Sequence, residues 1–95
     1  MRVMATISMP AAVGSQAVSD GTVGKLMQDT AGRWKPEAMY FTSNQGQRCA
    51  HIFFDMADSS DMVTFAEPFF SELDADVEIT PVMNIQDLQK GMSQL

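Results

Sequence analysis

The chain begins with a period-two alternation of apolar and polar residues. In residues 2–9, one side of this alternation is apolar and consists of Val3, Ala5, Ile7 and Met9. The pattern predicts a strand with one buried face, which Pro10 ends. Residues 11–21 are rich in Ala, Gly and Ser, and they leave loop, strand extension and weak helix open.

Between residues 23 and 34 the apolar positions change to helical spacing. The stripe consists of Val23, Leu26, Met27, Thr30 and Trp34. Residues spaced in this way lie on one side of a helix. Gly32 and Pro36 bracket the expected end of this helix.

Two β-rich runs follow, in EAMYFTSNQGQRCAHIFFDM, with Gln45-Gly46 between them. A two-residue turn at this position predicts a hairpin and fixes which residues face each other. Tyr40 then faces His51 across the hairpin, while apolar residues meet apolar residues on the other face.

Residues 58–73, DSSDMVTFAEPFFSEL, carry a helix start signal and a second apolar stripe. Asp58 is predicted as the N-cap, with Asp61 three residues further on. The stripe consists of Met62, Phe65, Ala66, Phe69 and Leu73. Pro68 lies in the interior, where it either kinks the helix or breaks it into two short pieces.

A strand and a short helix are expected at the end of the chain. Residues 75–82, ADVEITPV, alternate again, and Pro81 indicates a sheet edge or the end of the strand. Asn84 and Asp87 have the spacing of a capped helix start. The packing contacts expected of this helix are Ile85, Leu88 and Met92.

The predicted order is β-α-β-β-α-β followed by the C-terminal helix. With right-handed crossovers, this order gives a ferredoxin-like fold of the α+β class. Its antiparallel four-stranded sheet has the order 4-1-3-2, with both helices on one face. The apolar sides of the strands, including Met39 and Phe41, are expected under the helices. The 95 residues are enough for one such domain, residues 1–95.

The opposite face of this sheet is neither clearly solvated nor clearly core. Met4, Phe53 and Val82 exposed together would form an apolar patch of the kind that marks an interface or a ligand site. A second subunit laid sheet to sheet around a two-fold axis would cover the patch and enclose a partly polar cavity. We therefore expect a homodimer through the open sheet face, a dimeric α/β barrel.

Composition and charge narrow the class of partner. The single Cys excludes an intramolecular disulfide and suits a reducing compartment. No signal peptide or long apolar run is found, so a cytoplasmic protein with no membrane partner is expected. The formal net charge is -6 and the basic residues are scattered. Nucleic acid binding needs a concentrated basic surface, so no nucleic acid partner is expected.

Three stretches carry a resemblance to a known family: KPEAMYFT, AEPFFSELDADVEITPVMN and DLQKG. They resemble an uncharacterised family of short bacterial proteins of the dimeric α/β-barrel group, from about residue 20 onward and most strongly over residues 66–84. The resemblance implies the fold and the dimer and supplies no activity. The wider group includes cofactor-independent monooxygenases, isomerases and haem-handling members, and no catalytic motif of theirs matches this chain residue by residue.

His51 is the best single candidate for acid/base chemistry, because only its side chain normally titrates near neutral pH. The predicted hairpin places it across from Tyr40, with Thr6 or Met4 on the neighbouring strand. Thr6 and Tyr40 would orient a ligand in a cavity on this face, and Phe53 and Met4 would form its apolar walls. The alternative is a structural histidine, hydrogen-bonded to Tyr40 or to backbone at a dimer interface.

Cys49 and His51 give only a weak signal for a nucleophile or a metal. A thiolate nucleophile needs its base in direct contact, whereas residues two apart on a strand stand roughly 7 Å apart at the backbone. A zinc site needs three or four ligands, and neither a CxxC pair nor a second His is present. No metal and no cofactor are expected. Among the carboxylates Asp74, Asp76 and Glu78, only Glu78 is expected to face the cavity.

These inferences favour a homodimer that binds a small, partly apolar molecule in a cavity on the open sheet face. The residues expected to line this cavity are Met4, Thr6, Tyr40, His51, Phe53 and Glu78. Two alternatives stay open: a non-catalytic structural or protein-interaction dimer, and a cofactor-independent oxygenase- or isomerase-like enzyme that uses His51. The sequence names neither a ligand nor a reaction.

Overall fold

The computed structural model describes residues 1–95 as four strands and four helices. The strands are β1 (Arg2–Met9), β2 (Ala38–Asn44), β3 (Gln47–Asp55) and β4 (Asp76–Pro81). The helices are α1 (Ala11–Ser19), α2 (Thr22–Trp34), α3 (Asp61–Leu73) and α4 (Ile85–Met92). The predicted α+β class and the open antiparallel sheet of four strands are confirmed.

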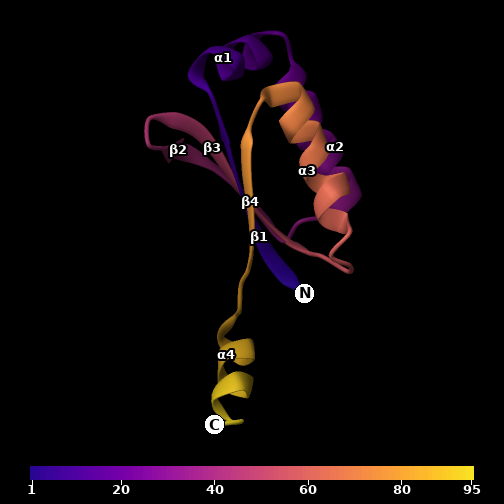
Figure 1. Ribbon diagram of the computed structural model, residues 1–95, viewed down its shortest axis with the longest axis vertical. Coiled ribbons are helices and arrows are strands. Elements are labelled where there is room, and N and C mark those ends of the chain that lie inside the picture. Colours follow the sequence, from indigo (N-terminus) through magenta and orange to yellow (C-terminus); the bar gives the residue numbers. More distant parts are fainter.

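The strands lie in the order β2-β3-β1-β4, which reads β4-β1-β3-β2 from the other edge. Helices α2 and α3 lie side by side over one face of this sheet, and α1 lies at the end where β1 finishes (Figure 1). No helix of the chain has the length and apolar character needed to cross a membrane. The other face of the sheet is left open.

The core lies between the sheet and the two long helices. Val3, Ala5 and Ile7 of β1 are completely buried. Phe54 of β3 stacks on Phe65 of α3 with ring centroids 4.5 Å apart. This face of the sheet carries the apolar side of every strand, as the alternation predicts.

Phe41 departs from this arrangement. The alternation predicts it under the helices, but its side chain is 62% exposed. It lies on the same face as Ala50, its register partner on β3. The β2–β3 hairpin extends beyond the area that the helices cover (Figure 1), which agrees with the high exposure of Phe41.

The ambiguous segment after β1 is a helix, α1. Gly14 and Ala17 are its buried residues. A Cβ added to Gly14 would lie 3.0 Å from Cγ of Met9, so the close contact with the end of β1 favours a glycine unless the Met9 side chain shifts. This packing explains a helix that intrinsic propensity alone did not favour.

The β2–β3 turn is the two-residue turn predicted from Gln45-Gly46. Both residues have positive φ, 51° and 78°, as a type I′ turn requires. The predicted pairing of Tyr40 with His51 is confirmed, and Thr42 lies opposite Cys49. The local turn therefore sets the register of the whole hairpin.

The start of α3 differs from the prediction by two residues. Its N-cap position is Ser60, not Asp58. Asp58 instead orders the turn before the helix, because its carboxylate accepts hydrogen bonds from the backbone N and the hydroxyl of Ser60, at 2.9 and 2.7 Å. The helix is continuous through Pro68, so the alternative of two short pieces is excluded.

Asp58 predicts a small acid-dependent loss of stability. The hydrogen bonds from Ser60 lower the pKa of its carboxyl group. A carboxyl group with a lowered pKa in the folded state stabilises the fold above its unfolded pKa of about 3.9, and this contribution disappears as the pH falls through the folded value. Asp58→Asn should therefore show a shallower loss of thermal stability below pH 4 than the unmodified protein. Equal acid profiles in thermal melts would contradict this role, and the effect is small because solvent screens the exposed group.

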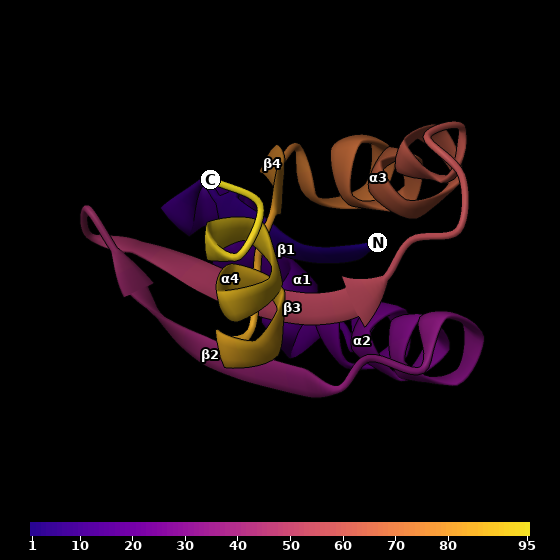
Figure 2. The same ribbon diagram turned by 90° about the horizontal axis from the view of Figure 1, so that it is seen from below.

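Helix α4 begins as predicted but packs differently. The Asn84 side chain accepts from the backbone N of Asp87 at 2.8 Å, and the Asp87 carboxylate accepts from the backbone N of Asn84 at 3.1 Å. The predicted packing contacts are wrong, since the apolar residues of α4 remain largely exposed: Ile85, Leu88 and Met92. The helix stands beyond the end of the sheet (Figures 1 and 2). The radius of gyration is accordingly 14.7 Å, against about 12 Å for a compact chain of this length.

Candidate functional site

Four of the candidate residues form one row across the open face of the sheet. Thr6 of β1 is the register partner of both His51 on β3 and Glu78 on β4. Tyr40 of β2 is the partner of His51. The order across the sheet is therefore Tyr40, His51, Thr6 and Glu78, which we call the polar row. Directly opposite residues of paired strands point to the same side, so all four side chains start from one face.

His51 occupies the centre of the polar row. Its Nδ1 and the hydroxyl of Thr6 share a hydrogen bond of 3.1 Å. Its Nε2 lies 3.9 Å from Sγ of Cys49. The hydrogen-bond partner of His51 is thus Thr6, and Tyr40 faces it across the hairpin without a hydrogen bond between the side chains.

Cys49 and His51 lie closer together than their backbone spacing suggested. The imidazole turns along the strand toward the thiol, which is buried and 3% exposed. A separation of 3.9 Å is a contact without a strong hydrogen bond. No cluster of three or more His, Cys, Asp or Glu side chains with metal-binding geometry exists in the chain.

On one side of the polar row the open face becomes more polar. The next row consists of Thr42, Cys49, Ser8 and Asp76. A hollow of about 170 Å³ lies here, lined only by polar residues: Thr6, Ser8, Asn44, Gln45, Gln47, Asp76 and Glu78. Its walls come from the β2–β3 turn and from β4, at opposite edges of the sheet. The open face is therefore concave at this end.

On the other side of the polar row the face becomes apolar. The next row consists of Ala38, Phe53, Met4 and Thr80. Tyr40 and Phe53 make an edge-to-face contact with centroids 6.4 Å apart. A hollow of about 440 Å³ lies over this part, with walls that again come from both edges: Arg2, Glu37, Ala38, Tyr40, Phe53, Val82, Met83 and Asn84.

A charged group closes the apolar end of the face. Arg2 forms ion pairs with Glu37 and, at 3.3 Å, with Asp87 of α4. The hydrogen bond to Glu37 is the main cause of the raised pKa of the Arg2 guanidinium. Arg2 is thus held as a cation where β1 meets the start of β2 and the first turn of α4.

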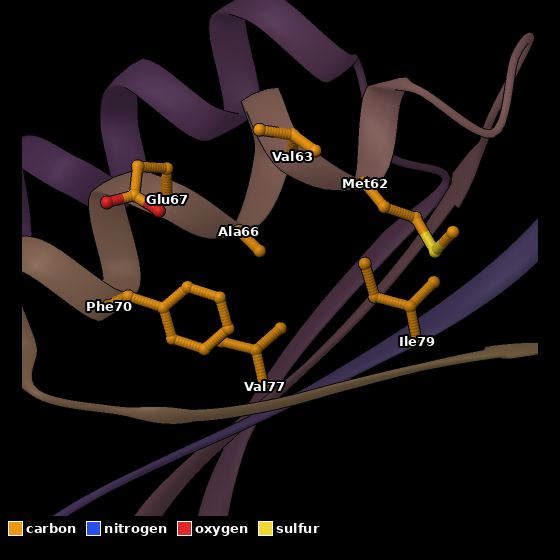
Figure 3. Close-up of a pocket in the computed structure, with 7 residues that line it drawn as sticks. All are labelled: Met62, Val63, Ala66, Glu67, Phe70, Val77 and Ile79. Atoms are coloured by element: carbon orange, nitrogen blue, oxygen red, sulfur yellow. The ribbon is translucent and has the colours of Figure 1, made fainter.

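Sequence reasoning missed a third hollow, on the helix-covered side of the sheet. It measures about 340 Å³ and lies between α3 and the edge strand β4. Phe70 points toward Val77 and Met62 toward Ile79, without closing the gap between them (Figure 3). Of its lining residues, Met62 and Ala66 belong to the predicted apolar stripe of α3. The sequence contains one signal for this hollow. Val63 and Phe70 are apolar and lie beside the α3 stripe, so α3 carries more apolar surface than the core covers.

The arrangement on the open face suits a ligand with two unlike ends. Hydroxyl, carboxamide and carboxylate groups surround the smaller hollow, and the larger one is lined mostly by aromatic and aliphatic groups, with Arg2, Glu37 and Asn84 beside them. The polar row separates the two. Concave sites of this composition, mostly apolar with a few placed polar groups, are typical of small-molecule binding.

Comparison with known proteins identifies one related family. Residues 26–95 match the model of a family described as a domain of unknown function, DUF3303. No curated protein matches the chain. The matched region contains β2, β3 and β4, with Tyr40, His51 and Glu78, while β1 lies before it.

Proposed function

The chain belongs to the DUF3303 family, whose function is unknown, and we propose that it is a homodimer that binds a small, partly apolar molecule between two open sheet faces. The observation that carries this proposal is the open face itself. It is concave, it joins a polar hollow to an apolar one, and no helix of the same chain covers it.

Exposed apolar groups support the dimer. Tyr40 is 63% exposed and Phe53 is partly exposed, in the middle of a face that water would otherwise cover. Burial of such a patch by a second copy removes apolar surface from water. In an isologous dimer both subunits use the same patch. The open sheet face can therefore serve as the interface on each copy.

Helix α4 supports the dimer independently. Its start is fixed by the capping box at Asn84, yet none of its residues is buried. A helix this short is marginal in water without packing. Packing of its apolar side, Leu88 included, against the second subunit would supply the missing contact.

The contacts of His51 favour binding over catalysis. Nδ1 is held by the hydroxyl of Thr6 at 3.1 Å, and Nε2 has a 3.9 Å contact with Sγ of Cys49. The ring is therefore anchored to the sheet through Nδ1. A general base needs a nitrogen within hydrogen-bond reach of the proton that it removes, and Nδ1 is already engaged by a side chain of the same sheet.

Filling the apolar hollow should prevent binding without preventing assembly. Ala38 lines this hollow at the start of β2, and Ala38→Trp would occupy the space that the ligand needs. We expect at least about a tenfold loss of affinity, equal to 1.4 kcal/mol. Nile red, a neutral dye that fluoresces in apolar sites, gives the affinity, and native mass spectrometry of protein from its own host shows any ligand that copurifies.

The control is Ala31→Trp, at an exposed position of α2 on the covered side of the sheet. It should bind the dye as the unmodified protein does. Two results would refute the proposal: sedimentation velocity that shows a monomer at micromolar concentration, or Ala38→Trp protein that retains both dye and copurified ligand.

A further inference from the structure

We infer that the two-fold axis of the dimer runs along the strands, so that each subunit completes its site with the partner's Glu78 placed against Tyr40. This inference rests on the proposed dimer and specifies which residues of the two copies meet. It follows from the order of the polar row and from the charges along it.

Two face-to-face arrangements are compatible with a two-fold axis between the sheets. An axis along the strands reverses the order of the strands, so that β4 of one copy lies over β2 of the other. An axis across the strands keeps the order and lays β4 over β4. The polar row crosses the sheet near the middle of the strands, where either axis superposes the row on its own copy.

Charge distinguishes the two arrangements. With the axis across the strands, Glu78 would lie over the partner's Glu78, with Asp76 one row away. Neither carboxylate forms an ion pair within the chain. The cations near the open face are engaged elsewhere, since Arg2 pairs with Glu37 and Asp87. Two unpaired carboxylates that face each other across an interface repel.

The other arrangement replaces this repulsion with a complementary pair. With the axis along the strands, Glu78 meets the partner's Tyr40, and the two carboxylates lie at opposite edges of the barrel. The Tyr40 hydroxyl has no hydrogen-bond partner within the chain, and its ring is 63% exposed. A phenol donates well to a carboxylate, and such charge-assisted hydrogen bonds are short and strong. His51 then lies over the partner's Thr6 at the centre.

A face-to-face dimer about either axis covers both free edges of the sheet, and an axis along the strands does so by bringing unlike edges together. β2 and β4 are the two edge strands, and exposed strand edges invite unwanted pairing with other chains. The concave face brings each edge toward the partner. The edge β2 of one copy then meets the edge β4 of the other on both sides, which closes the two half-barrels around the cavity.

Cysteine cross-linking tests the direction of the axis. In a Cys49→Ser background, Tyr40→Cys and Glu78→Cys chains are produced separately and also together, and each preparation is treated with a short bis-maleimide. We expect a cross-linked dimer between positions 40 and 78 only when both chains are present. Ser71→Cys, at an exposed position of α3, is the control that should not cross-link.

A double-mutant cycle gives a second readout that does not depend on cross-linking. Tyr40→Phe and Glu78→Gln keep the shape of both side chains at exposed positions, so the fold should be retained. Each is expected to weaken the dimer about tenfold, and the double variant no further than either single one. Sedimentation equilibrium supplies the dissociation constants.

The outcomes separate this inference from the proposed function. Glu78→Cys chains that cross-link to each other, or additive effects in the cycle, would overturn the axis and leave the dimer intact. A dimer that shows neither the cross-link between positions 40 and 78 nor the one between two copies of position 78 would refute the proposed axis. It would also refute the open face as the interface. A monomeric protein would overturn both proposals.

Discussion

Phe53→Asp is expected to convert the proposed dimer into a monomer. Phe53 lies on the central strand β3, in the apolar row next to the polar row, and its ring contacts Tyr40. An aspartate there would place a carboxylate without a partner inside the interface, which costs several kcal/mol. The two-fold axis places two such groups in one dimer. Each 1.4 kcal/mol is a tenfold change, so the loss of affinity should exceed a hundredfold, as sedimentation velocity over a dilution series will show.

Phe41→Asp is the matched control for this experiment. Phe41 belongs to the same hairpin and is equally aromatic, but it lies on the other face of the sheet and is 62% exposed. The same charge at this position should leave the dimer unchanged. A dimer that survives Phe53→Asp, or one that Phe41→Asp dissociates, would show that the open face is not the interface.

The hairpin shows what sequence alone can determine well. Gln45-Gly46 is a local signal for a turn with two positive φ values, and a two-residue turn leaves one register. The pairing of Tyr40 with His51 follows from that register. The position of His51 on the open face follows in turn from alternation along β3, because a slip by one residue would turn Ile52 and Phe54 out of the core.

Phe41 and α4 show where the same reasoning stops. Alternation tells which side of a strand or helix is apolar, but it does not tell what lies above that side. Phe41 has the predicted orientation and lies beyond the reach of the helices. Leu88 is on the predicted apolar side of α4, yet it remains 41% exposed. Both predictions required the positions of other elements, which depend on tertiary geometry.

The candidate site could be predicted in part for the same reason. The hairpin register paired Tyr40 with His51, whereas the neighbour of His51 on the adjacent strand stayed open between Thr6 and Met4 until the structure showed Thr6. The hollows could not be predicted, because they depend on how far the sheet curves. The contact between Nε2 of His51 and Sγ of Cys49 was also missed. The backbone spacing of two strand residues does not tell which rotamer a histidine ring adopts, and here the rotamer brings the two side chains together.

Phe54→Ala is expected to lower the free energy of unfolding by about 3–5 kcal/mol, as for other buried aromatic residues truncated to alanine. The Phe54 ring is 1% exposed, stacks on Phe65 at 4.5 Å and contacts Trp34 at 5.4 Å. Removal of the ring leaves a cavity beside Phe65 and Trp34. Either ring would have to leave its present packing position to fill that cavity. Urea denaturation gives the change, and all variants are compared at one subunit concentration because unfolding of the proposed dimer would be coupled to its dissociation.

Phe70→Ala tests whether burial causes this loss. Phe70 belongs to α3, as Phe65 does, but its side chain is 46% exposed and lines the hollow beside β4. Its truncation removes less apolar contact and should cost about 1 kcal/mol. A small domain has only about 5–15 kcal/mol of stability in total, so Phe54→Ala should bring the isolated subunit close to unfolding. If both variants lose the same amount, the aromatic cluster around Phe54 is not the centre of the core.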